Sequence, residues 1–231
     1  MTQYIKADQS IGCALKWALL SFLVLIASTS LFFIDVDSYE IFAKEDGIAE
    51  NLSFLFYLVA GIFLLMASFN NTHSQARGVL PVLLGLFFVV VAGEEISWGQ
   101  RLFNFDTPGL MAKENTQGEF NFHNLSAVDK NDSILNQHTL LNIFVLLNGV
   151  VIPIAYYFFG FVNSMITRLK FPVIPVSCTP VFLIAILYGQ VVPKLYPHWA
   201  HVEVKELVFS LGFFVFSIAF FRGDNVIDKA G

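Results

Sequence analysis

The sequence predicts an all-α fold, a bundle of six transmembrane helices that forms a single membrane domain over residues 1–231. Hydrophobic residues make up 56% of the chain and charged residues only 13%, whereas charged residues make up about 25% of soluble domains. The mean hydropathy is +0.66. Several apolar runs reach the roughly 20 residues that a helix needs to cross a bilayer.

The apolar runs and the signals between them define the expected elements. The first run is too long for the apolar region of a signal peptide, so we expect an uncleaved first span. Asp46-Gly47 predicts the start of the second helix, with Asp46 as its cap. Residues 100–133 are too polar to cross and form a long loop, and Pro153 predicts a kink in the fourth span. The expected spans are about residues 11–34, 52–69, 79–98, 134–162, 176–192 and 204–221.

The distribution of charge predicts the orientation. Six spans place both termini on one side of the membrane. That side carries seven Lys and Arg against three Asp and Glu, whereas the other side carries six against fifteen. Short loops dense in Lys and Arg stay in the cytoplasm. We therefore expect both termini in the cytoplasm and a strongly acidic face on the other side.

The most unusual polar stretch is Gly93–Arg101 (GEEISWGQR), directly after the third apolar run. A charge near hydrocarbon costs about 2.5–3.5 kcal/mol on insertion scales, so ionisable residues there usually have a role. If the helix continues, Glu94, Ser97, Trp98 and Arg101 share one face and Glu95 points elsewhere. The alternative is a helix end that has reached water, where Arg101 only neutralises a glutamate.

A second polar string, Gln117–Asn124 (QGEFNFHN), lies in the long loop. Its alternation puts Glu119, Asn121 and His123 on one side and two phenylalanines on the other. The polar clusters of the chain all fall on the non-cytoplasmic side, each next to a span end, so we expect them to converge on one mouth of the bundle. These clusters are Glu45/Asp46/Glu50, Glu94/Glu95/Arg101, Glu119/His123/Asn124, His138 and His198/His201/Glu203.

Imidazoles and carboxylates together form the ligand set of zinc or manganese. His198 and His201 are three residues apart, on one face if the segment is helical, and His123 or Glu94 would complete an open site. The metal would activate water, and a second glutamate would act as general base. The expected metal ligands are His123, His198, His201 and Glu94, and the expected catalytic residues are Glu94, Glu95, Arg101 and Glu119.

A structural alternative stays open for these clusters. The acids of residues 45–50 favour the positive end of the second helix dipole. His198 and His201 flank Trp199, which is typical of an interfacial aromatic belt. His138 stands in the first turns of the fourth span, where water would solvate it, and Arg101 would form a structural ion pair.

The leading hypothesis for the function is a metal-dependent hydrolase or transferase acting on a lipid or lipid-linked substrate. The first alternative is a non-catalytic scaffold or assembly factor whose polar face binds a partner. A transporter is less favoured, because the middles of the spans carry no charge and no internal repeat is found. The bilayer is an expected partner. Nucleic acid is not, since the chain has no basic patch.

The strings GEEISWGQR and QGEFNFHN, together with Glu45-Asp46-Gly47 and Glu50, resemble a family of bacterial multi-pass inner-membrane proteins of uncharacterised function. The resemblance covers most of the chain. It implies a bacterial inner membrane, with the acidic face in the periplasm, and no particular activity. A fainter likeness is to alkaline-ceramidase-type membrane hydrolases, which bind zinc through histidines in a helix bundle. This chain has six expected spans rather than seven and H-x-x-H rather than H-x-x-x-H, so no residue role is carried over.

Overall fold

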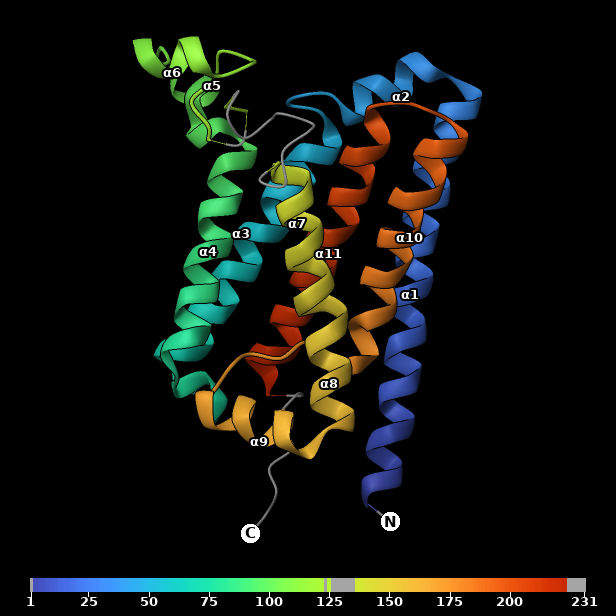
Figure 1. Ribbon diagram of the computed structural model, residues 1–231, viewed down its shortest axis with the longest axis vertical. Coiled ribbons are helices and arrows are strands. Elements are labelled where there is room, and N and C mark those ends of the chain that lie inside the picture. The colour runs from blue at the N-terminus through green and yellow to red at the C-terminus, as the bar shows by residue number, and fades with distance from the viewer. Residues whose placement is uncertain (1, 123, 126–135, 224–231) are drawn as a thin grey trace.

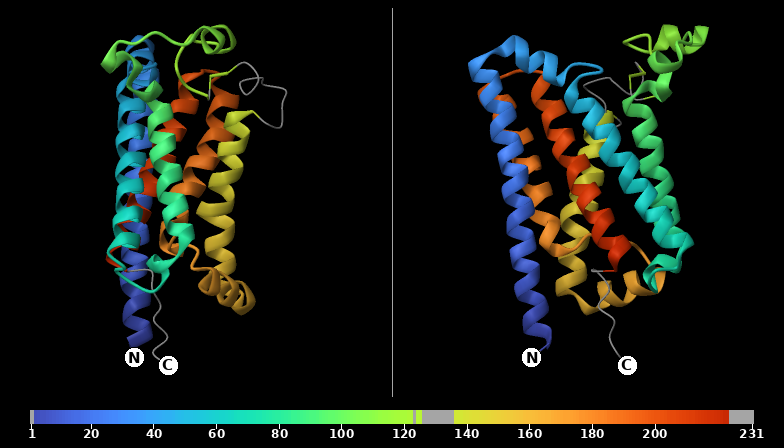
Figure 2. Two further views of the ribbon diagram at one scale, coloured as in Figure 1. Left: turned by 90° about the vertical axis from the view of Figure 1, so that its left-hand side faces the viewer. Right: turned by 180° about the vertical axis from the view of Figure 1, so that it is seen from behind.

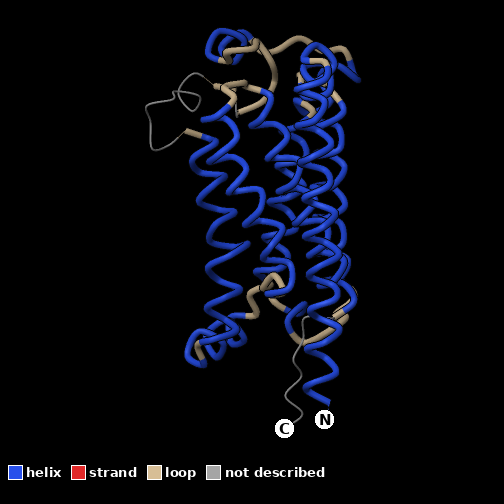
Figure 3. Tube along the Cα trace, turned by 90° about the vertical axis from the view of Figure 1, so that its right-hand side faces the viewer, coloured by secondary structure: helices blue, strands red, loops and turns tan. Residues whose placement is uncertain are grey.

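The structure of the protein, a computed structural model, describes residues 2–122, 124–125 and 136–223, with side chains from residue 15 onward. In these residues the chain forms helices and loops without a β-strand (Figure 3). Within the same part of the chain, five helices are long and apolar enough to cross a membrane. They become six when the bent pair of residues 79–95 and 97–103 counts as one span. The fold is therefore an all-α bundle of transmembrane length, as predicted.

The long helices stand side by side (Figures 1 and 2). They are α1 (Thr2–Ile34), α3 (Ile48–Phe69), α4 (Val79–Glu95), α10 (Thr179–Leu195) and α11 (Ala200–Arg222). They are joined by one span made of α7 (Gln137–Leu146) and α8 (Ile152–Phe158), which follow one another end to end. A π-helical turn, η3 (Leu147–Val151), joins α7 to α8. The shorter elements are α2 (Val36–Ala43), η1 (Gln75–Arg77), η2 (Ser97–Gly99), α5 (Gln100–Phe103), α6 (Gly109–Glu114), α9 (Gly160–Leu169) and η4 (Val176–Cys178).

The two ends of the bundle differ in what they carry. The helices α2, α5 and α6 lie at one end, at the top of Figure 1, which we call the loop end. At the opposite end, which we call the terminal end, α1 begins, α11 ends and α9 lies across the bundle. The acidic segments therefore gather at the loop end.

Helix α11 is the centre of the bundle, with buried residues on all of its sides, as suits a helix that is apolar all round. Its Phe213 ring packs against Phe88, Phe144 and Phe182 at centroid distances of 4.8, 5.6 and 5.0 Å. A Cβ on Gly212 would lie 2.7 Å from the Phe182 ring, so the glycine makes room for it. We call these four phenylalanines the aromatic layer, and they fill the interior of the bundle.

The third span ends earlier than expected. Helix α4 stops at Glu95 rather than near residue 98, and the following short helices turn away from it by 69°. Glu94, Ser97 and Arg101 therefore do not share one face of a continuous helix, because the backbone leaves the α conformation at Ile96.

The fourth span also differs from the expected range 134–162. Residues 134–135 lie outside the described part, the span ends at Phe158, and Gly160 begins the separate helix α9. Pro153 lies in the first turn of α8, directly after the π-helical turn, where a missing N–H is tolerated.

The polar ends of two other helices extend beyond the expected apolar ranges. Helix α3 begins at Ile48 rather than near residue 52, and α11 begins at Ala200 rather than near residue 204. Each carries a glutamate in its first turn, Glu50 and Glu203. Both glutamates are therefore placed on helices at the loop end.

Candidate functional site

The string Gly93–Arg101 builds a sharp turn at the loop end of α4. Ser97 and Trp98 have positive φ angles of 47° and 53°, a conformation that costs about 1–2 kcal/mol for a residue with a side chain. Gly99, with a φ of 75°, lies in the same region without this cost, because glycine has no Cβ. A Cβ on Gly93 would lie 3.0 Å from the Trp98 ring. The two glycines thus give the turn its room and its conformation.

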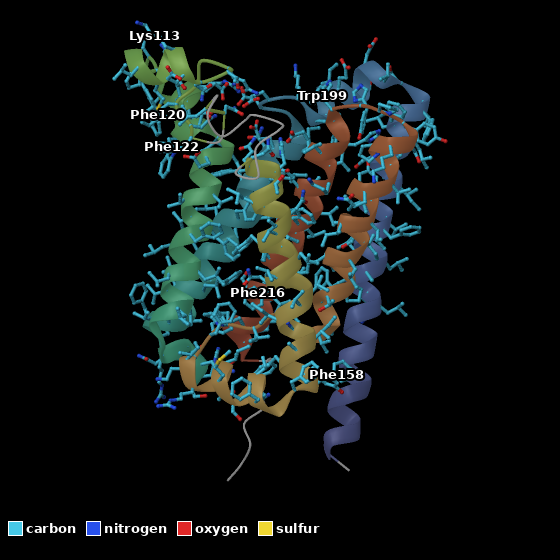
Figure 4. All side chains as sticks on the ribbon, in the orientation of Figure 1. Lys113, Phe120, Phe122, Phe158, Trp199 and Phe216 are labelled. Atoms are coloured by element: carbon cyan, nitrogen blue, oxygen red, sulfur yellow. The ribbon has the colours of Figure 1, made fainter. Side chains whose placement is uncertain are left out.

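Hydrogen bonds of Glu94 hold this turn in place. Trp98 Nε1 donates to Glu94 Oε1 at 2.6 Å, and the backbone N–H of Phe122 donates to Oε2 at 2.6 Å. Glu94 therefore joins the first polar string to the second, and Figure 4 shows Phe122 beside the loop end of α4. Both oxygens of this carboxylate have protein partners.

Glu119 is the buried centre of the loop, with 8% of its surface exposed. Its Oε2 accepts hydrogen bonds from Ser97 Oγ at 2.6 Å and from Asn121 Nδ2 at 3.1 Å. Its Oε1 pairs with Arg101, and Arg101 also pairs with Asp46 in the turn before α3. The contacts of Glu119 and Arg101 are structural, because they fasten the loop to α4 and to that turn.

Side-chain amides complete the scaffold of the second string. Asn115 Oδ1 accepts the backbone N–H groups of Gln117 and Glu119 at 2.9 and 3.0 Å. Asn115 Nδ2 donates to Asn121 Oδ1 at 2.8 Å, and Gln100 Oε1 accepts the N–H of Phe120 at 2.7 Å. Backbone groups in this loop have no partners from a helix or a sheet, and the side-chain amides form hydrogen bonds with them instead. We call Glu94, Ser97, Gln100, Arg101, Asn115, Glu119 and Asn121 the loop network.

Glu95 points away from the loop network and into the bundle. Successive helix residues lie about 100° apart around the axis, so adjacent glutamates face different surroundings. Glu95 meets the electrostatic repulsion of other carboxylates, from the turn before α3, from α3 and from α11. The same groups repel Glu203. We call this set the carboxylate cluster: Glu45, Glu50, Glu95, Glu203 and Glu206.

The cationic side chains of the cluster gather at Glu206. His138 Nδ1 of α7 lies 3.1 Å from Glu206 Oε1, and Lys205 Nζ lies 3.5 Å from the same oxygen. Lys205 is buried, with its ammonium 5.6 Å from the centroid of the Phe209 ring. A Cβ on Gly189 would lie 2.6 Å from Lys205 Cδ, so this glycine accommodates the stem of the lysine. One carboxylate of the cluster is thereby matched with a cation.

Glu95 and Glu203 differ from Glu206, since neither of their carboxyl groups makes a hydrogen bond with a residue that the structure describes. Both lie deep inside the bundle, yet both keep part of their surface accessible. Beside them, the hydroxyl of Tyr57 is buried without a hydrogen-bond partner and interacts electrostatically with Glu95 and Glu206. Buried polar groups are nearly always paired. Three side chains that lack such a pairing therefore meet at one place.

The two histidines of the H-x-x-H pair have partners of their own. His201 is fully buried, and its Nδ1 lies 2.7 Å from the Tyr39 hydroxyl and 3.0 Å from the Tyr188 hydroxyl. His198 Nε2 lies 3.2 Å from Glu40 Oε1. The two imidazoles, 5.9 Å apart between ring centroids, lie where α2, α10 and α11 meet.

The expected metal ligands are not assembled in the described part of the chain. Figure 4 shows Trp199, which stacks on His198, near α11, whereas Phe122, which binds Glu94, lies beside α4. No group of three His, Cys, Asp or Glu among the described residues is placed to hold a metal ion. His123 lies outside the described residues. A zinc or manganese site that includes His123 stays a prediction.

The expected convergence of the polar clusters occurs in part. Glu45, Glu50, Glu95 and Glu203 come together, and His138 joins them through Glu206. Arg101 and Glu119 belong to the loop network, and His198 and His201 to a separate contact.

Sequence reasoning missed three residues of the site: Tyr57, Lys205 and Glu206. Helical spacing carries the signal that finds two of them. Glu50 and Tyr57 lie seven residues apart on α3, and Glu203 and Glu206 lie three apart on α11. Such spacings place each pair on one helix face.

Comparison with family models, with curated proteins and with solved structures finds no match for this chain.

Proposed function

We propose that this protein is a multi-pass protein of the bacterial inner membrane whose loop end faces the periplasm. There it performs acid–base chemistry, as a hydrolase or transferase, on a lipid or lipid-linked substrate. The observation that carries the proposal is the meeting of Glu95 with Tyr57 on one side and Glu203 on the other, at the loop end of a membrane bundle. All three lie deep, and none has a hydrogen-bond partner among the described residues. Ionisable groups at such a place usually mark a functional site.

The cluster contains carboxylates in two kinds of surroundings. Glu206 faces the ammonium of Lys205 and the imidazole of His138. The charged groups that act on Glu95 in the described part of the chain are all carboxyl groups, whereas Glu203 lies among three carboxyl groups with Lys205 as a cationic neighbour. Neighbouring carboxyl groups in unlike surroundings are able to divide the roles of general acid and general base. In this proposal, Glu206 is the base that activates a nucleophile, and Glu95 or Glu203 protonates the leaving group.

The charge of the site limits its substrate. Five carboxyl groups stand against three basic side chains: Lys205 and His138 at Glu206, and Arg101, which acts on Glu45. An excess of acidic groups repels phosphate, attracts cationic groups and does not oppose neutral ones. We therefore expect an ester or an amide bond to be the reacting group, rather than a phosphate bond.

A divalent metal is not needed for this chemistry. The predicted zinc or manganese site depends on His123 and stays a separate hypothesis. No step of the proposed reaction is assigned to a metal.

Transport is supported less well. The aromatic layer lies directly beside Tyr57, whose ring is 5.8 Å from Phe88 and 6.2 Å from Phe213 between centroids. These rings are fully buried or nearly so. A polar path from the carboxylate cluster to the terminal end would have to pass through them, whereas carriers hold their polar groups near the midplane.

A scaffold function is the second candidate, and the loop end supplies an observation for it. The loop network supports a segment that displays apolar side chains: Leu102, Phe103, Leu110 and Phe122 are 83%, 73%, 83% and 60% exposed. Exposed apolar groups on a fixed support are typical of a binding face. A scaffold would depend on these residues and would tolerate changes in the carboxylate cluster.

Lipid analysis of whole membranes tests the proposal. Cells that overproduce the wild type are compared with cells that overproduce Glu95→Gln and with Asp37→Asn, an exposed acid-to-amide control on α2. Relative to cells that overproduce Glu95→Gln, cells with the wild type or the control should contain less of one ester or amide lipid and more of its cleavage or transfer product. Identical lipid profiles in the wild type and Glu95→Gln would contradict the enzyme hypothesis and favour the scaffold.

A further inference from the structure

A groove lies between α7 and α10 on the outer surface of the bundle. Its volume is about 290 Å³, at the lower end of the range for small-molecule sites. Several of its residues are exposed on a surface that would face lipid. Its lining residues are Thr139, Asn142, Ile143, Leu146, Ile186 and Gln190.

The polarity of the groove changes with depth. Thr139 lies in the first turn of α7, at the loop end, and Asn142 lies one turn deeper. Gln190 lies between one and two turns before the loop end of α10. The apolar lining is deeper still, with Leu146 about 10 Å further along the axis than Thr139, at 1.5 Å per residue. The groove is thus polar toward the membrane surface and apolar toward its interior, as an amphiphile is.

Two carboxamides of the groove lack a hydrogen-bond partner among the described residues. The side chains of Asn142 and Gln190 make no hydrogen bond with any residue in the described part of the chain. A carboxamide that faces hydrocarbon without a partner costs roughly 1–3 kcal/mol on protein mutational data. No charged side chain lines the groove. A ligand with neutral hydrogen-bonding groups would satisfy both amides.

The groove lies at the same level along the bundle as the contacts of Glu206. His138, which contacts Glu206, directly precedes Thr139. Gly189, which accommodates the stem of Lys205, directly precedes Gln190. Adjacent helix residues point about 100° apart. A lipid head held between α7 and α10 would therefore lie at the same depth as the residues that flank Glu206, on the neighbouring face of each helix.

We infer that this groove binds the head and the first methylenes of a neutral amphiphile with hydroxyl, ester or amide groups, of the diacylglycerol type. The amphiphile belongs to the leaflet at the loop end. That the groove is the route by which the substrate reaches the carboxylate cluster rests on the proposed function. The binding itself does not depend on turnover.

Photolabelling tests the inference. The purified protein is reconstituted in phosphatidylcholine vesicles that contain a diacylglycerol with a diazirine near its head group. The labelled peptides are then identified by mass spectrometry. The variants are Asn142→Leu, which keeps the number of heavy side-chain atoms, and Gln190→Leu, which removes one. Leucine in a lipid-facing helix does not weaken membrane insertion. The control is Val191→Leu. Val191 is adjacent to Gln190 but lines a separate groove, between α1 and α10.

We expect labelling of α7 and α10 in the wild type and the control. Each leucine variant should lower it by about 2- to 12-fold, the loss expected for one hydrogen bond. Phosphatidic acid with the same diazirine should label these helices less than diacylglycerol does. Equal labelling in the wild type and both leucine variants would overturn the inference, and so would equal labelling by the two probes.

Glu95→Gln separates this inference from the proposed function. Normal labelling in Glu95→Gln together with lost lipid turnover supports both. Normal turnover in Glu95→Gln would overturn the proposed reaction while the labelling still decides whether the groove binds the amphiphile.

Discussion

Glu94 and Glu95 are adjacent in the chain, yet their carboxylates belong to different structures. Glu94 accepts hydrogen bonds from Trp98 and from the backbone of Phe122, so both of its oxygens are used by the loop network. Glu95 has no hydrogen-bond partner among the described residues and faces the carboxylate cluster. One of the pair is therefore structural and the other is available for chemistry.

This difference predicts opposite effects of the same substitution. In Glu94→Gln the amide NH2 group replaces one carboxylate oxygen and faces the N–H donor of Trp98 or Phe122. We therefore expect the free energy of unfolding to fall by about 1.5–3 kcal/mol. Glu95→Gln removes a carboxylate from a group of like charges and breaks no hydrogen bond, so stability should stay the same or rise. Thermal unfolding in mild detergent measures both. A similar loss in the two variants would contradict the division of roles.

Arg101 is expected to control the opening of the loop. Arg101→Met removes both ion pairs, with Asp46 and Glu119, and leaves the buried Glu119 carboxylate without its cation. Cleavage of residues 102–122 by chymotrypsin should become about tenfold faster, because proteolysis follows the population of the open form. Lys113→Met, on the exposed helix α6, is the control. Equal cleavage rates in the two variants would show that the ion pairs do not hold the loop.

The contact between α3 and α4 depends on two glycines. A Cβ on Gly61 would lie 2.7 Å from the carbonyl oxygen of Gly85 and 2.8 Å from a methyl of Val89. Gly61→Ala should therefore destabilise the protein by about 1–3 kcal/mol, the range for overpacking. Gly109 has open space around it and no positive φ, so Gly109→Ala should be neutral or slightly stabilising. Thermal unfolding of the two variants checks the prediction, and equal melting temperatures would contradict it.

His201 is expected to stabilise the fold without holding a metal. His201→Ala leaves a cavity and removes the partner of the Tyr39 and Tyr188 hydroxyls, so unfolding free energy should fall by about 2–4 kcal/mol. Metal content, measured by mass spectrometry on protein purified without chelator, should not change. Stoichiometric metal that disappears in a folded His201→Ala protein would contradict this assignment.

The metal hypothesis itself has a different test. Among the expected ligands, only His123 lies outside the described residues, so His123→Ala is the variant that should release a bound ion. Wild-type protein that stays free of metal after zinc and manganese are added back would remove the hypothesis.

The membrane bundle was predictable because long apolar runs are a property of local sequence. The bilayer demands about 20 apolar residues per helix, and this requirement is visible without any contact being known. The position of the acids at span ends was visible in the same way. The end of α4 was harder to predict, because Ser97 and Trp98 adopt left-handed conformations that need tertiary hydrogen bonds to persist.

The sequence by itself determined the helices and the loop end at which the acidic residues gather. Only the tertiary structure decided which of these residues are paired. The partner of Glu94 is the backbone of Phe122, 28 residues away, and the partner of His201 is Tyr39, 162 residues away. Chain spacing does not encode such contacts, because they depend on how helices distant in sequence pack around α11. The same packing leaves Glu95 and Glu203 without hydrogen-bond partners in the described chain.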